Sequence, residues 1–291
     1  MAVPDRQERL AGRHALVDTI PFTMPVSSKR SPALMAAFSI DADKARALIP
    51  CDEIHPFKLW NRGLLVITVI DYRETCIGKY IEFSIAIACT HGEKPAPRLL
   101  PGLLMKCFGT GQYVVDLPVS TEVSVKGGKG IWGMPKHQAN LDFIIGNEWI
   151  SSQYDLDGQM CMRIDIKKPK CTWLPLDMGA ANYCSFRGML MKSYIYFKSK
   201  AGLSLFKPGS ARLTLGDHPR MAGLKTLDID PTPVFTGFFP EIHGVLDDHF
   251  ECWFITQQNA ITASVEGLES TFPLGQSQEW LAPPNRTPEN L

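Results

Sequence analysis

The sequence predicts a single mainly β domain, a barrel or sandwich with a few short helices. From residue 63 onward, the chain is dominated by short runs of β-branched and aromatic residues, broken by Gly, Asn or Asp. Helical periodicity is scarce. The 291 residues are 45% hydrophobic, enough for a substantial core, and no repeat or linker divides them. We expect the domain to span residues 20–255, with an N-terminal lead-in at 1–19 and a C-terminal extension at 256–291.

The expected elements follow in chain order. Residues 31–40 predict a strand, and residues 41–50 predict a short helix with Asp41 as its N-cap and Pro50 as its stop. Helical periodicity elsewhere is confined to parts of 118–130 and 240–256. The last twenty residues, which include "APPNRTPEN", lack core-forming content, so we expect them to be loose. Further strands are expected at 63–75, 79–89, 139–146, 148–158, 159–168 and 193–202, with a hairpin turn at Asp157 and Gly158.

The strand expected at 79–89 has two different faces. Side chains alternate across a sheet, so the bulky residues from Ile81 to Cys89 share one face, which is suited to packing against another layer. The other face carries Tyr80, Glu82 and small residues. Small side chains that face the inside of a barrel leave room for a ligand, and Glu82 would lie in that room. The alternation alone also allows Glu82 to point to solvent from a one-sided sheet.

Composition excludes several classes of function. Lysine plus arginine equals aspartate plus glutamate at 30 each, and no basic block suits a nucleic-acid surface. The longest apolar run, at 63–70, is far shorter than the roughly 20 residues of a membrane span, and the N-terminus lacks a secretory pattern. The eight cysteines show no CxxC motif, which favours free thiols in a reducing compartment. We expect a cytoplasmic protein with no nucleic-acid or membrane partner.

A lysine in apolar company marks the stretch "GIWGMPKHQAN" at 130–140. Lys136 directly follows Pro135 and lies close to Trp132 and Met134. A lysine amine attacks a carbonyl only when it is unprotonated, and the reference pKa of lysine is about 10.4. An apolar pocket or a nearby cation can bring such a pKa down, and the iminium that then forms withdraws electrons from neighbouring bonds. Lys136 is therefore either a surface charge or a Schiff-base nucleophile.

The chain resembles the acetoacetate decarboxylase superfamily over roughly residues 20–250. The resemblance is carried by "GKYIE" at 78–82 and "GKGIWGMPKH" at 128–137, supported by "SPALMAAFSIDADKARALIP" at 31–50 and "GSARLTLGDHPRMAGLKTLDI" at 209–229. It implies a closed antiparallel β-barrel with flanking short helices and an internal pocket. It also implies Schiff-base chemistry without a cofactor, in a homo-oligomer.

The resemblance assigns roles to single residues. Lys136 matches the Schiff-base lysine and Glu82 the pocket glutamate. His137 stands where the family has a second lysine. The family's arginine, which would hold a substrate carboxylate, falls without a gap at Ser31, and Arg30 is one position off. A one-residue shift reverses the face of a strand, so Arg30 would need a bulge to reach the pocket. The expected substrate-binding residues are Arg30, Tyr80, Trp132, Met134 and His137.

The expected function is that of a carbon–carbon lyase, most simply a carboxy-lyase that decarboxylates a small β-keto acid such as acetoacetate through an iminium at Lys136. Aldolase, dehydratase or cyclase chemistry on another keto substrate uses the same lysine and stays open, as does a barrel that binds a small ligand without turnover. His243, Asp247, Asp248 and His249 could approach a metal, but no cysteine or glutamate completes a ligand set. We expect neither metal nor cofactor.

Overall fold

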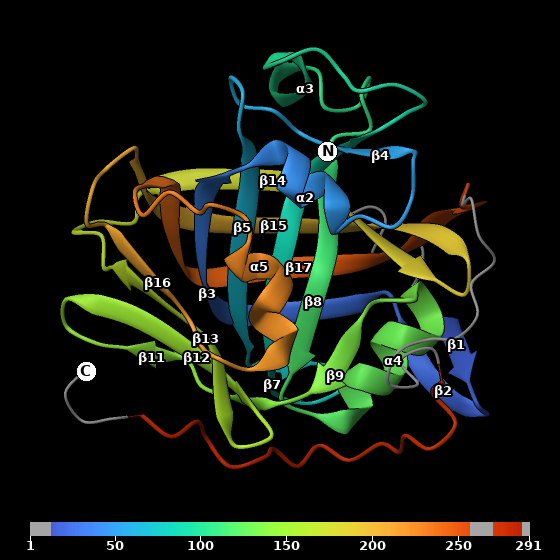
Figure 1. The fold of residues 1–291 in the computed structure, drawn as a ribbon. Coiled ribbons are helices and arrows are strands. Elements are labelled where there is room, and N and C mark those ends of the chain that lie inside the picture. The colour runs from blue at the N-terminus through green and yellow to red at the C-terminus, as the bar shows by residue number, and fades with distance from the viewer. Residues whose placement is uncertain (1–12, 257–269, 287–291) are drawn as a thin grey trace.

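The computed structural model describes residues 13–256 and 270–286, with only the backbone described at 247–249. Figure 1 shows a barrel covered on one side by a second, smaller sheet. Its helices are α2 (Ala42–Ala47), α3 (Leu100–Leu103), α4 (Glu122–Trp132) and α5 (Ala222–Lys225), with a 3-10 turn at Pro219–Met221. Its strands are β1 (Arg13–Val17), β2 (Ile20–Met24), β3 (Val26–Ile40), β4 (Ile54–Pro56), β5 (Gly63–Tyr72), β6 (Glu74–Thr75), β7 (Tyr80–His91), β8 (Gly111–Val119), β9 (Lys136–Gln138), β10 (Asn140–Leu141), β11 (Ile144–Ile145), β12 (Trp149–Leu156), β13 (Gln159–Lys167), β14 (Leu174–Phe186), β15 (Met189–Leu205), β16 (Ala211–Leu215) and β17 (Pro233–Phe254).

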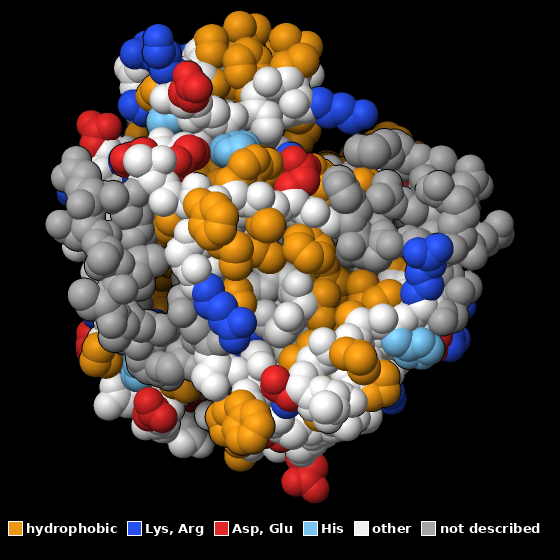
Figure 2. All heavy atoms as spheres, turned by 90° about the vertical axis from the view of Figure 1, so that its right-hand side faces the viewer, with side chains coloured by type: hydrophobic (Ala, Val, Ile, Leu, Met, Phe, Trp, Pro, Cys, Tyr) orange, Lys and Arg blue, Asp and Glu red, His pale blue; other side chains and the backbone are white. Residues whose placement is uncertain are grey.

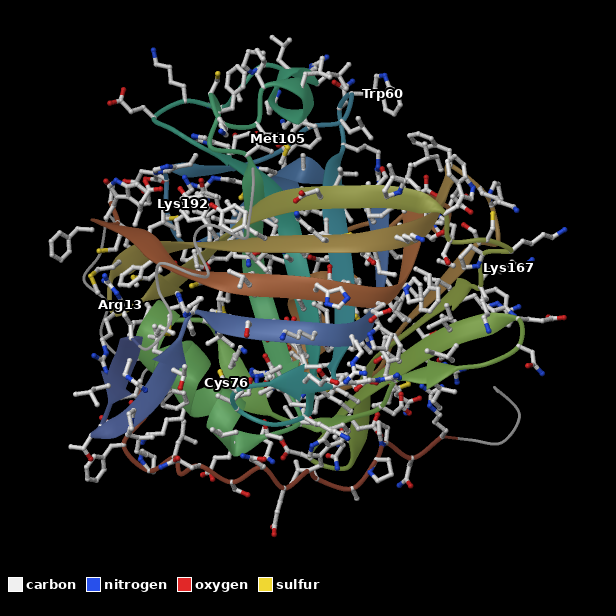
Figure 3. All side chains as sticks on the ribbon, turned by 180° about the vertical axis from the view of Figure 1, so that it is seen from behind. Arg13, Trp60, Cys76, Met105, Lys167 and Lys192 are labelled. Carbon is white, nitrogen blue, oxygen red and sulfur yellow. The ribbon has the colours of Figure 1, made fainter. Side chains whose placement is uncertain are left out.

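Seven of the described strands close the barrel. Their order is β7, β5, β3, β17, β15, β14 and β8, and β8 pairs back with β7. Seen from behind, β14, β15, β17 and the first part of β3 lie side by side and cross the direction of β5, β7 and β8 (Figure 3). The rest of β3 runs antiparallel to β5. The pairings are antiparallel except for the short parallel contact between β14 and β8. The mainly β class and the closed barrel that the sequence predicts are confirmed.

The second sheet covers the outside of the barrel. It consists of β10, β12, β13 and β16, with β11 paired to β12. Its buried side chains join the bulky face of β7 in the largest hydrophobic cluster, where Phe83 and Tyr154 approach with ring centroids 6.0 Å apart. Burial of this apolar face fixes which side of β7 points into the barrel.

Most of the local predictions are confirmed. The strand predicted at 31–40 is the second half of β3, and the carboxylate of Asp41 accepts hydrogen bonds from the backbone of Asp43 and Lys44 as the N-cap of α2. Asp157 and Gly158 have positive φ angles of 52° and 76°, as a tight hairpin turn requires. The run 139–146 forms only the short strands β10 and β11. All eight cysteines are free thiols.

Two predictions about the second half of the chain are wrong. No helix forms at 240–256: residues 240–254 are the end of β17, which pairs with β15 on one side and β3 on the other. The prediction that the last twenty residues are loose is wrong for residues 272–286, and residues 287–291 lie outside those described. The Trp280 indole donates to the Lys79 carbonyl at 3.1 Å, the Gln138 amide donates to the Glu279 carbonyl at 3.1 Å, and Arg286 pairs with the Asp142 carboxylate at 2.6 Å. Figure 1 shows this red segment running along one end of the barrel.

Exposed apolar side chains gather around α3, at the end of the barrel opposite α4. Leu100, Leu103 and Leu104 are exposed there, and Figure 2 shows hydrophobic side chains at the top of the molecule, where α3 lies. Among the residues described, no helix has the length and apolar character needed to cross a membrane.

Candidate active site

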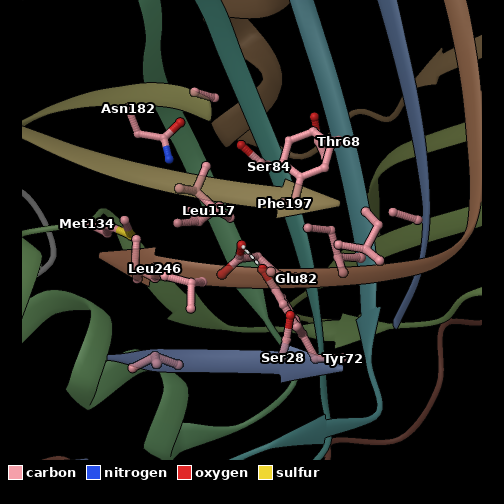
Figure 4. A pocket seen from close by; sticks show the side chains of 18 of the residues that line it. Ser28, Thr68, Tyr72, Glu82, Ser84, Leu117, Met134, Asn182, Phe197 and Leu246 are labelled. Carbon is pink, nitrogen blue, oxygen red and sulfur yellow. Dashed lines mark hydrogen bonds between the residues drawn. The ribbon is translucent and has the colours of Figure 1, made fainter. Parts of the chain in front are cut away.

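A cavity of about 110 Å³ lies inside the barrel. Strands β3, β5, β7, β8, β14, β15 and β17 all contribute to its wall, and Figure 4 shows Glu82 projecting into it among mostly apolar side chains. Its lining consists of Val26, Ser28, Ala33, Met35, Thr68, Ile70, Tyr72, Thr75, Tyr80, Glu82, Ser84, Gln112, Val114, Leu117, Met134, Lys136, Ala180, Asn182, Ile195, Phe197, Phe239, Ile242, Gly244, Val245 and Leu246.

The two faces of β7 have the orientation that the alternation predicts. Tyr80, Glu82 and Ser84 line the cavity, whereas Ile81 and Phe83 on the other face belong to the core beneath the second sheet. Glu82 therefore faces the interior of the barrel, and the alternative in which it points to solvent is wrong.

Lys136 is the first residue of β9, the strand that follows α4, and its side chain reaches the same cavity. The helix α4 ends at Gly133, whose φ of 65° is the left-handed C-cap conformation that glycine favours. After Met134 and Pro135, β9 begins with Lys136 and pairs in parallel with β8, opposite Leu117. The lysine stem lies so close to Gly128 of α4 that a side chain there would overlap its Cδ.

The amine of Lys136 is held among named partners. Its Nζ lies 2.6 Å from Glu82 Oε2 and donates to Ser124 Oγ at 3.1 Å. It also lies 5.5 Å from the centre of the Tyr80 ring, within range of a cation–π contact. The side chains of Lys136 and Glu82 are 5% and 16% exposed. A lysine amine and a carboxylate thus share one buried site.

Two stacked tyrosines support the carboxylate. The rings of Tyr72 and Tyr80 are 4.5 Å apart, and the Tyr72 hydroxyl lies 3.5 Å from Glu82 Oε1. Burial, together with the negative charge of Glu82, raises the pKa of both hydroxyls well above the ordinary tyrosine value. Both phenols therefore keep their protons, and Tyr72 faces Glu82 as a donor.

Arg30 does not reach the cavity, contrary to the prediction. The three residue steps from 28 to 31 on β3 pair with only two steps, from 242 to 244, on β17, so β3 carries a bulge here. Arg30 lies in this bulge and has a positive φ of 51°. Before the bulge Ser28 lines the cavity, and the next residue of β3 that does so is Ala33. Arg30 lies between them and points outward. Its side chain is 66% exposed and pairs with Glu74.

His137 also lies outside the cavity. It follows Lys136 on β9, so its side chain points to the opposite side of the strand. Its Nε2 lies 2.9 Å from the Tyr154 hydroxyl, and its Nδ1 lies 3.4 Å from both Asp116 Oδ1 and an Arg220 nitrogen. Burial, with a contribution from the charge of Arg220, lowers the pKa of His137 to about 3. His137 is thus a neutral part of the packing under the second sheet.

This burial predicts a pH-dependent stability. Below a pH of about 6.5 the unfolded chain protonates His137, whereas the folded chain does so only near pH 3, so the free energy of unfolding falls as the pH falls through this window. His137→Gln should weaken that fall, by up to about 1.4 kcal/mol per pH unit. Urea unfolding at pH 7, 5.5 and 4.5 measures it. Equal pH slopes in the two proteins would contradict the assignment.

The remaining expected pocket residues divide into two groups. Tyr80 and Met134 line the cavity, as predicted. Trp132 does not, although it is buried, because it packs behind Met134 and Leu117 in a separate cluster. Trp132 therefore packs against residues of the cavity wall without lining the cavity itself.

Gly128 offers a test of how precisely the amine is placed. Gly128→Ala should displace the Lys136 side chain and lower turnover about 10²-fold, since an error of 1 Å can have that effect. Gly127→Ala is the matched control, because its new methyl group would meet Phe22 at 2.9 Å rather than Lys136. Steady-state kinetics alongside thermal unfolding separate the two. Equal losses of turnover in both variants would refute the special role of Gly128.

Several site residues were not anticipated from the sequence. Tyr72 and Thr68 lie on the inward face of β5, which strand alternation could have found. Ser124 and Gly128 lie on α4, and no local pattern distinguishes them. Within the described residues, no group of three or more potential ligands is arranged to hold a metal. His243 is paired with Glu241 at 3.3 Å, and the side chains of Asp247, Asp248 and His249 lie outside those described.

Comparison with solved structures finds the same fold. An acetoacetate decarboxylase structure is 16% identical, with 87% of this chain and 99% of that chain covered and a TM-score of 0.60. The enduracididine biosynthesis enzyme MppR is 14% identical, with 78% and 87% covered and a TM-score of 0.56. An acetoacetate decarboxylase from Legionella pneumophila is 12% identical, with 77% and 85% covered and a TM-score of 0.55.

A comparison with protein families covers the part of the chain that carries the site. The model named acetoacetate decarboxylase matches residues 12–168, just over half of the chain, which include both Glu82 and Lys136. No curated protein matches the chain significantly. With the family match, the shared barrel and the buried lysine in its cavity, the chain belongs to the acetoacetate decarboxylase family.

Proposed function

We propose that the chain is a carbon–carbon lyase that forms an iminium between Lys136 and a carbonyl substrate. The observation that carries this proposal is the 2.6 Å contact between Lys136 Nζ and Glu82 Oε2 on the wall of a largely apolar cavity. A protein that only binds its ligand has no need for a buried amine beside a buried carboxylate, whereas imine chemistry needs both a nucleophile and a group that moves protons.

The reaction starts with a proton transfer. Glu82 takes a proton from the Lys136 ammonium, the free amine attacks the carbonyl carbon, and a carbinolamine forms. Glu82 returns the proton to the carbinolamine hydroxyl, which leaves as water. The product is a positively charged iminium beside the Glu82 carboxylate, near the face of the Tyr80 ring. The bond between the carbon adjacent to the iminium carbon and its substituent can then break, because the electrons of that bond flow toward the nitrogen and give an enamine.

Two reactions fit this intermediate. Loss of CO2 from a β-keto acid is supported by the family to which the chain belongs. Retro-aldol cleavage is supported by the position of Arg30 outside the cavity, which leaves no arginine in the described lining for a substrate carboxylate. The similar fold of MppR, in a structure with the condensation product of pyruvate and imidazole 4-carboxaldehyde, is in keeping with aldol-type chemistry.

Substrate-dependent inactivation tests the proposal. The purified chain is treated with borohydride in the presence and absence of β-keto acids, α-keto acids and β-hydroxy ketones, and release of CO2 or of carbonyl products is followed. We expect permanent inactivation only when a substrate is present, because borohydride then reduces an iminium. If the protein turns over a substrate and keeps its full activity after borohydride treatment in the presence of that substrate, the iminium route is excluded.

A further inference from the structure

We propose that residues 274–280, near the C-terminus, are a positioning segment of the active site. They bind the three elements that carry Glu82, Ser124 and Lys136, and so hold the amine at the carboxylate. This inference rests on the proposed iminium at Lys136 and names residues, far away in the sequence, on which its formation depends.

Three separate elements form the geometry that has to be held. The Lys136 amine lies 2.6 Å from Glu82 on β7 and donates to Ser124 on α4 at 3.1 Å. Lys136 itself belongs to β9, which is three residues long and has only β8 as a partner strand among the described strands. A strand so short makes few backbone hydrogen bonds, so the sheet alone fixes its position weakly.

The first turn of α4 is completed by the positioning segment. The side chain of Thr121, the N-cap residue, makes no capping hydrogen bond. The backbone N–H of Val123 in the first turn instead donates to the carbonyl of Ser277 at 3.1 Å. Because the first N–H groups of a helix have no partner within it, this bond satisfies a donor that the helix itself leaves unpaired. It ties the segment to the residue directly before Ser124.

The next residues of the segment reach β9 and the start of β7. The Glu279 carbonyl accepts a hydrogen bond at 3.1 Å from the side-chain amide of Gln138, two residues after Lys136. The Trp280 indole donates to the carbonyl of Lys79 at 3.1 Å, and Lys79 directly precedes β7. Four consecutive residues thus contact all three elements of the site.

Packing adds to these hydrogen bonds. Leu274 packs against the hydrophobic cluster that contains Tyr80, whose ring lies 5.5 Å from the Lys136 amine. The Gln278 side chain lies so close to Gly78 that a side chain at this glycine would overlap it. Figure 1 shows the red segment passing along the end of the barrel where α4 and β9 lie.

The positioning segment is added to the barrel rather than part of it. Residues 274–280 form no helix or strand, and the seven barrel strands close without them. A change in this segment should therefore act on the placement of Lys136 while the barrel stays folded. The chain beyond it offers a contrast, because Arg286 pairs with Asp142 at 2.6 Å and neither residue lines the cavity.

Rapid quenching with borohydride tests the inference. The chain is mixed with acetoacetate or with 4-hydroxybutan-2-one at increasing concentrations and quenched at successive times, and the adduct on the Lys136 peptide is measured. We expect Leu274→Ala and Trp280→Ala to lower the saturating rate constant of adduct formation about tenfold, since misplacement of a reacting group by about 1 Å can lower a rate 10²-fold. The half-saturating concentration should stay within about twofold, because neither residue lines the cavity. Leu274→Met, which keeps the apolar volume, should restore the rate constant.

Arg286→Gln is the matched control outside the positioning segment. It should lower the melting temperature, because it leaves the Asp142 carboxylate without its arginine, and it should keep the saturating rate constant. Circular dichroism at the assay temperature verifies that each variant is folded, so that unfolding does not mimic a loss of rate.

Each outcome discriminates. Unchanged rate constants in folded Leu274→Ala and Trp280→Ala would overturn the inference and leave the proposed lyase intact. An equal loss in Arg286→Gln would also overturn it, because the effect would then follow stability rather than placement of Lys136. If the unaltered protein forms no adduct with either probe or with any other compound of the substrate panel, the proposed function and this inference both fail.

Discussion

Replacement of Lys136 by arginine is expected to reduce turnover to the background rate and to abolish covalent trapping. A guanidinium keeps the positive charge beside Glu82, but it stays protonated at any usable pH and cannot attack a carbonyl. The ion pair persists in the variant, so the fold should be retained. Steady-state assays and borohydride trapping measure the loss, and circular dichroism with thermal unfolding measures the fold.

The chain offers a matched control in Lys126. This lysine of α4 is also buried and paired, with Asp18 at 3.0 Å, but it does not line the cavity. Lys126→Arg should therefore keep trapping at Lys136. If Lys136→Arg retains turnover while the fold is intact, the Lys136 amine is not the nucleophile. Loss of trapping in both variants would point to damage of α4 rather than to loss of a nucleophile.

Replacement of Glu82 by glutamine is expected to lower turnover about 10²–10⁴-fold, the usual contribution of a positioned proton-transfer group. The amide keeps the shape of the side chain but cannot take up or return a proton. Trapping on Lys136 should still occur but should form more slowly, because the nucleophile is present while the group that takes its proton and returns it to the carbinolamine hydroxyl is missing. The variant therefore separates the presence of the nucleophile from the proton transfers that assist imine formation.

The neighbouring hydroxyl gives a comparison for this effect. Tyr72 lies 3.5 Å from Glu82, a long distance for a hydrogen bond, so Tyr72→Phe should change turnover by less than about tenfold. Single-turnover kinetics with both variants measure the individual steps. A Glu82→Gln protein that keeps full turnover would show that the carboxylate only balances charge.

The sequence predicts the centre of the site well because its determinants are local. Alternation along β7 separates a bulky face from the face that carries Glu82, and the side on which a bulky face is buried is strongly specified in a sheet. The placement of Lys136 depended more on the resemblance of "GKGIWGMPKH" to a known family than on alternation, since β9 is only three residues long.

The parts that sequence reasoning missed depend on contacts between distant segments. The bulge that turns Arg30 outward is set by pairing of β3 with β17, some two hundred residues away. Residues 240–254 of β17 lack a clear strand pattern in the sequence, because irregularities in the pairing with β3 interrupt strict alternation. The segment 270–286 is held by hydrogen bonds such as that from Trp280 to the Lys79 carbonyl, which leave no hydrophobic pattern in the sequence.

The most direct measurement is the mass of the peptide that carries Lys136 after borohydride reduction in the presence of a ketone substrate. The account predicts that this peptide gains the mass of the ketone plus two hydrogens minus one water at Lys136, and that the peptides carrying Lys126 and Lys129, from the same helix, remain unmodified. A reduced adduct on another lysine, or turnover with no adduct on the Lys136 peptide, would contradict the assignment of Lys136 as the nucleophile.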